Sequence, residues 1–93
     1  MTDKEKAIKE LETIPWIGKA SSERLYEVGI RKVSDLKNAD SEEIYMESCA
    51  KSGERIDRCW LYVIRCAVYY ASTKNPNPAM LQWNFWSDKN QKG

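Results

Sequence analysis

A short segment between two predicted helices combines the residue types that can hold a phosphate group: residues 15–19 read Pro-Trp-Ile-Gly-Lys. Pro15 disfavours a helical conformation in the residue before it, and Gly18 supplies the backbone freedom for a sharp turn into a second helix. The first amides of a helix lack intrahelical acceptors and lie at the positive end of its dipole, so they can bind a phosphate oxygen. The expected contacts are the amides of Gly18, Lys19, Ala20 and Ser21, together with the Lys19 ammonium, whose charge salt would screen.

A second candidate surface is a stripe on the long apolar segment 54–72. Basic and aromatic side chains alternate there at i, i+4, i+7 and i+11, and they are Arg58, Tyr62, Arg65 and Tyr69. This pattern suits backbone tracking or base stacking along a nucleic acid. Alternatively, Arg58 pairs with a neighbouring acid such as Glu54, and the two tyrosines complete the edge of the core. This alternative is favoured, because a helix in so small a bundle must bury more than one face.

Three cysteines in a chain without histidine raise the question of a metal or redox site. Cys59 and Cys66 lie seven residues apart on one predicted helix face, and Cys49 lies on the helix before it, so the three could converge. A structural zinc site needs four Cys or His ligands at short paired spacings, and the sequence has no CxxC pair. The odd count also argues against a disulfide framework. We therefore expect buried thiols that act as small apolar groups, and no metal or other cofactor.

The sequence lacks the features that would indicate an enzyme. It has no histidine to act as a base, no glycine-rich loop of the P-loop or Rossmann type, and no paired carboxylates that the sequence can place together. We expect neither catalysis nor a small-molecule substrate.

The elements that must position these residues are all expected to be helical. Apolar residues recur at helical spacing in four segments, residues 3–11, 19–28, 41–50 and 54–72. Pro15, Gly29 and Gly53 separate these segments, and β-branched residues nowhere alternate with polar ones over a useful length. The prediction is an all-α compact bundle of about five helices, counting a short helix between the second and third segments.

The pattern within the helices predicts which side chains form the core. On the longest segment, a stripe at i, i+3, i+4 and i+7 consists of Ile56, Cys59, Trp60, Val63, Cys66, Ala67 and Tyr70. On the second segment, Ala20, Leu25 and Val28 are expected to share the buried face.

The C-terminal part begins with Asn-Pro-Asn-Pro, which ends the long helix. Four large apolar side chains then follow within six residues: Leu81, Trp83, Phe85 and Trp86. They are too apolar to be left exposed together, so we expect them to pack back on the bundle near Trp60 and Val63, or else to dock a partner. The expected layout is a helical domain over residues 1–73, an aromatic extension over 74–87 and a disordered tail over 88–93.

Residues 11–36 resemble a helix-hairpin-helix motif (HhH), a nucleic-acid-binding element. The core pattern of that family, h-P-G-h-G with h an apolar residue, falls on Ile14, Pro15, Trp16, Ile17 and Gly18. The resemblance implies a sequence-independent contact between backbone amides and DNA phosphate, usually from the minor-groove side. Trp16 stands where the family has its first glycine. Its ring can alter the turn, shield the amides, stack on a sugar or base, or pack locally in the core.

The second half of the chain carries another signature. Residues 57–71 read D-R-C-W-L-Y-V-I-R-C-A-V-Y-Y-A, which is similar to the string D-R-C-x-L-Y-V-x-R-C-A-V-Y-Y-A of a small bacterial family called pathogenicity-locus or mitomycin-resistance-like proteins. Together with the hairpin and the C-terminal W-N-F-W, the resemblance covers about residues 8–87, and it implies no particular activity. A looser likeness, in the order hairpin, G-I-x-x-V-x-D-L and a Tyr-bearing helix, links the chain to the C-terminal domain of TfoX-type competence regulators.

Length and charge limit the function further. The chain has 93 residues and a net charge of +1, which suits one compact domain without a strongly basic face. The sequence has neither a bilayer-spanning apolar run nor a signal-peptide pattern, which favours a cytoplasmic protein without a membrane partner. The main hypothesis is a weak, sequence-independent DNA-binding module that contacts phosphate through residues 16–21. The alternative is an α-helical protein-interaction domain that does not bind nucleic acid directly.

Overall fold

The structure, a computed structural model, describes residues 2–91. Its longest helices are α1 (Asp3–Leu11), α2 (Lys19–Glu27), α3 (Ser41–Ser52) and α4 (Arg58–Ser72). Three 3₁₀ helices, η1 (Val33–Leu36), η2 (Pro78–Leu81) and η3 (Trp83–Trp86), and the one-turn helix α5 (Asp88–Gln91) complete this range. No strand occurs between residues 2 and 91, which confirms the all-α class. Four helices in this range are longer than two turns, and η1 lies where a fifth, short helix was expected.

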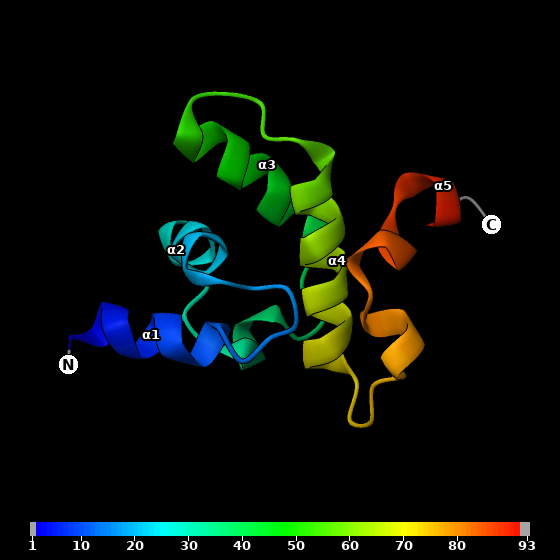
Figure 1. The fold of residues 1–93 in the computed structure, drawn as a ribbon. Helices are drawn as coiled ribbons and strands as arrows, with labels where there is room; N and C mark the ends of the chain where they lie inside the picture. The colour runs from blue at the N-terminus through cyan, green and yellow to red at the C-terminus, as the bar shows by residue number, and fades with distance from the viewer. Residues whose placement is uncertain (1, 92–93) are drawn as a thin grey trace.

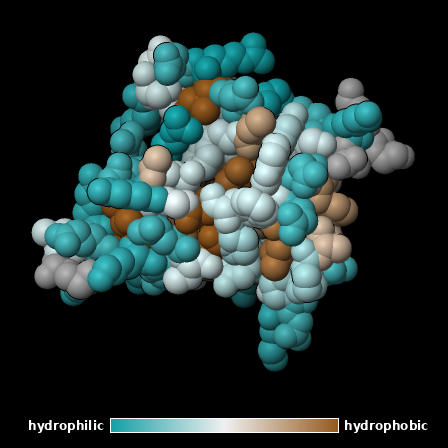
Figure 2. Space-filling model, viewed as in Figure 1, coloured by the Kyte–Doolittle hydropathy of each residue, from teal (hydrophilic) through white to brown (hydrophobic). Residues whose placement is uncertain are grey.

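The long helix α4 separates two parts of the molecule (Figure 1). On one side, α1 packs against α2 and α2 against α3, while α3 and η1 pack against α4. On the other side, η2 and η3 follow along α4, and α5 packs against η3. Figure 2 shows hydrophobic side chains gathered toward the middle of the molecule, with hydrophilic ones over the outer surfaces of α1 and α3.

Side chains and glycine fix the helix ends that orient α4. Asp40 accepts a hydrogen bond from the Glu43 amide at the start of α3, and Asp57 accepts one from the Cys59 amide at the start of α4. Gly53 ends α3 at a φ of 75°, in the left-handed region where glycine is unstrained. The chain therefore reverses between α3 and α4, and the two helices lie side by side.

The hydrophobic core lies between α4 and the N-terminal elements, and its members all fall within residues 11–67. Leu61 and Ile64 of α4 are fully buried there, although the expected stripe omitted both. Of the seven expected members, Cys59 is exposed, so its place in the core was wrong, whereas Val63 and Tyr70 are partly buried and pack against the core. The apolar pattern of α4 fits several rotations of the helix, because two sides are covered, and packing selects one of them.

Helix α2 buries the expected Leu25, and Val28 packs against the core, but the expectation for Ala20 was wrong. Ser22 and Leu25 are buried, whereas Ala20 is exposed. The Ser22 hydroxyl donates to the Lys19 carbonyl at 2.8 Å, which satisfies it within the core. The first turn of α2 therefore stays accessible to solvent at Lys19 and Ala20.

The aromatic extension packs back on α4, but not at the expected place. The ring centroids of Trp86 and Tyr69 lie 5.4 Å apart, so η3 covers the Tyr69 face and not the region of Trp60 and Val63. Every residue of η2 and η3 is exposed or half-buried, and Phe85 is 37% exposed. The extension thus covers α4 without entering the hydrophobic core.

The chain beyond the extension was expected to be disordered from residue 88. Asp88 instead begins α5, and its carboxylate is fixed by α4, as described below. Residues 92–93 of that expected tail lie outside the described residues. Within the described range, each helix is too short or too polar to cross a bilayer.

Candidate nucleic-acid interface

Two buried isoleucines anchor the turn that precedes α2. Ile14 and Ile17 are 2% and 5% exposed, and the Ile17 amide donates to the Ile14 carbonyl at 3.2 Å. Between them, Trp16 has a φ of 71°, a left-handed conformation that is costly for a residue other than glycine. Gly18 has a φ of −97°, which any residue adopts. The expectation that Gly18 supplies the freedom for the turn was therefore wrong, because Trp16 makes the turn.

Gly18 is the N-cap of α2, and it has no side chain to cap the helix. The first intrahelical bond runs from the Ser22 amide to the Gly18 carbonyl at 2.9 Å, so the amides before Ser22 have no acceptor within the helix. Gly18, Lys19 and Ala20 are exposed, and Ser21 is half-buried. The structure thus places the four expected phosphate-facing amides together at the start of α2.

Charges of both signs surround this helix start. Lys19 lines a shallow hollow of about 280 Å³ between α1 and α2. Its other charged lining residues are Lys4, Lys9, Glu5, Glu12 and Glu23. Three lysines and three glutamates nearly cancel at a distance, so long-range attraction of a phosphate chain is weak here.

Trp16 contacts the C-terminal segment and not the core. Its indole Nε1 donates to the Leu81 carbonyl at 2.6 Å, and its side chain stays 49% exposed. An indole N–H is a donor and cannot accept a hydrogen bond from a backbone amide, so Trp16 does not cap α2. One of the expected alternatives was that the Trp16 ring packs locally in the core, and its exposure contradicts this alternative.

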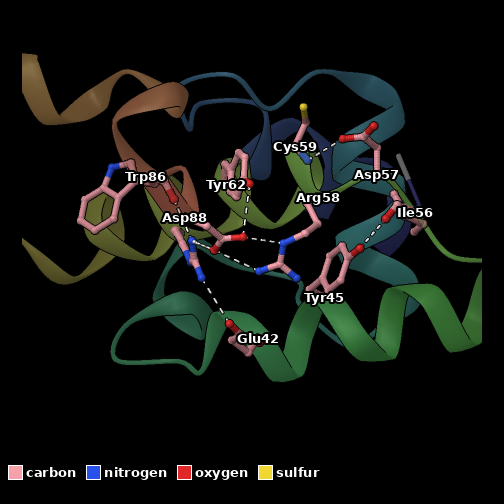
Figure 3. Close-up of polar contacts among 10 residues, drawn as sticks. Glu42, Tyr45, Ile56, Asp57, Arg58, Cys59, Tyr62, Trp86 and Asp88 are labelled. Carbon is pink, nitrogen blue, oxygen red and sulfur yellow. Dashed lines mark hydrogen bonds and ion pairs between the residues drawn. The ribbon is translucent and has the colours of Figure 1, made fainter. Parts of the chain in front are cut away.

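The α4 stripe binds the chain's own C-terminal segment (Figure 3). Arg58 donates from Nε and Nη2 to the two carboxylate oxygens of Asp88, at 2.6 and 3.0 Å. Arg65 Nη1 donates to Asp88 Oδ1 at 2.9 Å, and the Tyr62 hydroxyl donates to Asp88 Oδ2 at 3.3 Å. Arg58 therefore pairs with an acid, as the alternative interpretation predicted, but its partner is Asp88 and not Glu54.

The family described as Pathogenicity locus matches residues 4–92. The chain belongs to the pathogenicity-locus family. Both candidate surfaces of this pathogenicity-locus protein, the α2 start and the α4 stripe, lie within the matched range. No curated protein and no solved structure matches the chain.

Further contacts fix Arg65 and Tyr69, the last two residues of the stripe, in this pathogenicity-locus protein. Arg65, whose side chain is 15% exposed, also donates to the Trp86 carbonyl at 2.8 Å and to Glu42 of α3 at 3.2 Å. The Tyr69 hydroxyl accepts a hydrogen bond from the Asn77 amide at 2.8 Å, next to the tilted contact of its ring with Trp86. All four side chains of the stripe thus contact residues 77–88.

The charges around Asp88 stabilise its ionised form. The hydrogen bonds from Arg58, followed by that from Arg65, hold the pKa of the Asp88 carboxyl well below its usual range. The same hydrogen bond raises the pKa of the Arg58 guanidinium further above its already high value. Both side chains remain about one third exposed, so solvent weakens the pair relative to a buried one.

The three cysteines of this pathogenicity-locus protein lie in different environments. Cys66 is fully buried, its thiol lies 3.8 Å from the Met80 carbonyl, and burial raises its pKa to about 11. Cys59 is exposed beside Asp57, whose hydrogen bond raises the thiol pKa. Cys49 is half-buried, and its sulfur accepts from the Ile56 amide. In the part of the chain that is described, no group of three acidic, Cys or His side chains is placed to hold a metal.

Sequence reasoning missed Asp88, the residue on which the α4 stripe converges. The one available signal was that Asp88 is the sole acidic residue among residues 74–93, which carry three lysines. A single acid in a polar tail does not indicate its partner, because the partner depends on the path of the chain after the prolines.

Proposed function

We propose that the protein binds DNA weakly and without base preference, through the backbone amides at the start of α2. The observation that carries the proposal is the exposed start of α2, where the N-cap is Gly18 although the fold has room for a side chain there. A Cβ on Gly18 would meet no atom within 4 Å, and the φ of Gly18 is ordinary. A phosphate oxygen that approaches the first amides closely supplies a reason for the missing side chain.

The likeness of the turn to a helix-hairpin-helix motif supports the same proposal. Trp16 occupies the position of the first glycine in h-P-G-h-G, and it has the positive φ that a glycine there would allow. The hydrogen bond of its indole to Leu81 directs the polar edge of the ring to the C-terminal segment. The amides of α2 therefore remain available in spite of the bulky residue in the turn.

Lys19→Glu tests this proposal by reversing the charge at the helix start. We expect it to weaken the binding of every DNA sequence similarly, because the contacts are to phosphate. In anisotropy titrations with a labelled duplex, the wild-type log K should fall with log salt with a slope of about −1 to −2, as expected for one or two phosphate contacts. Lys37→Glu, the same charge change at an exposed residue after η1, is the matched control.

The α-helical protein-interaction domain remains the second proposal, favoured by the balanced charges around Lys19. Absence of duplex binding at low salt would overturn the DNA proposal in favour of this one. Equal affinities of Lys19→Glu and Lys37→Glu would instead show that DNA binds elsewhere than at the start of α2.

A further inference from the structure

The C-terminal residues 77–88 contact five of the ten residues that the sequence selected for nucleic-acid binding. Leu81 accepts a hydrogen bond from Trp16 at the α2 turn, and Asp88 binds the stripe on α4. Asn77 and Trp86 contact the last residue of that stripe, Tyr69. One segment therefore covers parts of two surfaces that lie far apart in the sequence.

The contacts of Asp88 have the geometry that guanidinium groups use for phosphate. Its two carboxylate oxygens accept from two nitrogens of Arg58, and one of them also accepts from Arg65. Such a fork binds a carboxylate or a phosphate with the same pair of parallel hydrogen bonds. The Tyr62 hydroxyl adds a third donor on the same face (Figure 3).

An aromatic platform lies beside this anion site. The Tyr69 ring faces the Trp86 ring at a centroid distance of 5.4 Å and an angle of 39°. Arg65, Tyr69 and Trp86 also line an open groove of about 560 Å³ between α4 and the loop before α3. Both rings are half-buried. Arginines that can pair with phosphate beside an aromatic ring are the combination that single-stranded nucleic acids use, with backbone on the cations and bases on the rings.

The segment 77–88 is attached in a way that allows its removal. The hydrophobic core consists of residues 11–67, with partly buried apolar residues up to Ala71 packed against it. Residues of η2 and η3 are exposed or half-buried, and the Arg58–Asp88 pair is about one third exposed. Cys66 is fully buried beside the Met80 carbonyl, so removal of the segment uncovers its thiol.

We propose that the α4 stripe is a binding site for single-stranded nucleic acid, and that Asp88 and Trp86 occupy it within the same chain as substitutes for a phosphate and a base. This site goes beyond the proposed duplex contact at α2 and does not depend on it. Nucleic acid must displace the segment 77–88 to bind. The apparent affinity therefore equals the intrinsic affinity multiplied by the fraction of molecules in which the segment is released.

Asp88→Asn tests the proposal with a labelled oligothymidylate of about twelve nucleotides, a length that a small binding surface can span. We expect the variant to bind this oligonucleotide about fivefold more tightly or better than the wild type does. The reason is that the segment is released more often when no ion pair to Arg58 and Arg65 holds it. Glu47→Gln, which removes one negative charge from an exposed residue of α3, controls for net charge and should change the affinity by less than about twofold. Adding Arg58→Gln to Asp88→Asn should remove the gain.

The alkylation rate of Cys66, followed on its peptide by mass spectrometry, reports whether the segment has opened. It should rise in Asp88→Asn and rise further in a chain that ends at Pro78, which lacks Met80, η3 and α5. If neither variant binds the oligonucleotide better than Glu47→Gln, the α4 site is overturned. Loss of helical circular dichroism in both variants would also overturn it, because the proposal requires the core to survive release.

The two proposals fail separately. A gain in Asp88→Asn together with equal duplex binding by Lys19→Glu and Lys37→Glu leaves the α4 site standing and removes the α2 site. If Lys19→Glu binds duplex more weakly and Asp88→Asn does not bind the oligonucleotide more tightly, the α2 site stands and the α4 site is removed.

Discussion

The start of α2 and the stripe on α4 are the two surfaces that we propose for phosphate, and they differ in the groups that they present and in what already contacts them. At α2 the donors are backbone amides of three exposed residues and the half-buried Ser21, fixed by the buried Ile14 and Ile17. On α4 the polar groups belong to long side chains, and all of them contact the segment 77–88: Arg58, Tyr62 and Arg65 donate to it, and Tyr69 accepts from it. Backbone donors need no ordering before they bind, whereas the side-chain donors are already ordered by an internal partner.

The comparison implies different dependences on the C-terminal segment. The α2 surface shares one hydrogen bond with it, between Trp16 and Leu81. The α4 surface shares two ion pairs, a hydroxyl–carboxylate hydrogen bond, two hydrogen bonds to backbone groups and a pair of rings with it. Changes in the segment should therefore alter α4 strongly and α2 weakly.

Ending the chain after Pro78 should have the largest effect on stability. This truncation removes the contacts of Asp88 and Trp86 with α4, and we expect the melting temperature to fall by about 5–15 °C. Helical circular dichroism should persist, because the core lies within residues 11–67. A truncated chain that melts like the full-length protein would show that the segment is not docked in solution, and would favour a partner-binding role for its aromatic residues.

Acid should release the same segment reversibly. Because the pKa of Asp88 is lowered in the folded chain, its contribution to stability is present at neutral pH and is lost as the pH falls below the usual carboxyl range. Tryptophan fluorescence of the wild type should therefore change between about pH 5 and pH 2, a window set by carboxyl protonation. Asp88→Asn should lack this part of the transition. An identical acid response in the two proteins would show that another carboxyl controls the change.

Gly18→Ser should have the smallest effect on stability and still distinguish the two surfaces. The extended backbone of Gly18 suits a serine N-cap, and a Cβ there meets no atom within 4 Å, so stability should change by less than about 0.5 kcal/mol. The serine hydroxyl would accept from an amide of the first turn and compete with phosphate. Duplex binding should weaken while the alkylation rate of Cys66 stays unchanged. Unchanged duplex binding would contradict a role of these amides.

Much of the local structure could be predicted from the sequence, because it depends on neighbouring residues. Helical spacing located α1 to α4, and Gly53 ended α3 as expected, although α4 begins at Arg58 and not at residue 54. The same periodicity correctly put Arg58, Tyr62, Arg65 and Tyr69 on one face of α4, since residues three and four apart share a face on any helix.

Predictions from neighbouring residues failed where the sequence allows two conformations almost equally well. Trp16, and not Gly18, adopts the left-handed conformation, because the buried isoleucines on both sides of the turn fix its path. On α4, Leu61 and Ile64 face the core and Cys59 faces solvent, a rotation selected by the elements that pack on the helix.

The sequence by itself determined which residues start α2 and which of the basic and aromatic residues share a face of α4. Only the tertiary structure decided what contacts them: Leu81 reaches Trp16 across 65 residues, and Asp88 reaches Arg58 across 30. These pairings depend on the direction the chain takes after Pro76 and Pro78 and on the shape of the α4 surface. Neither follows from local spacing, because a contact between distant residues is selected by the packing of the whole fold.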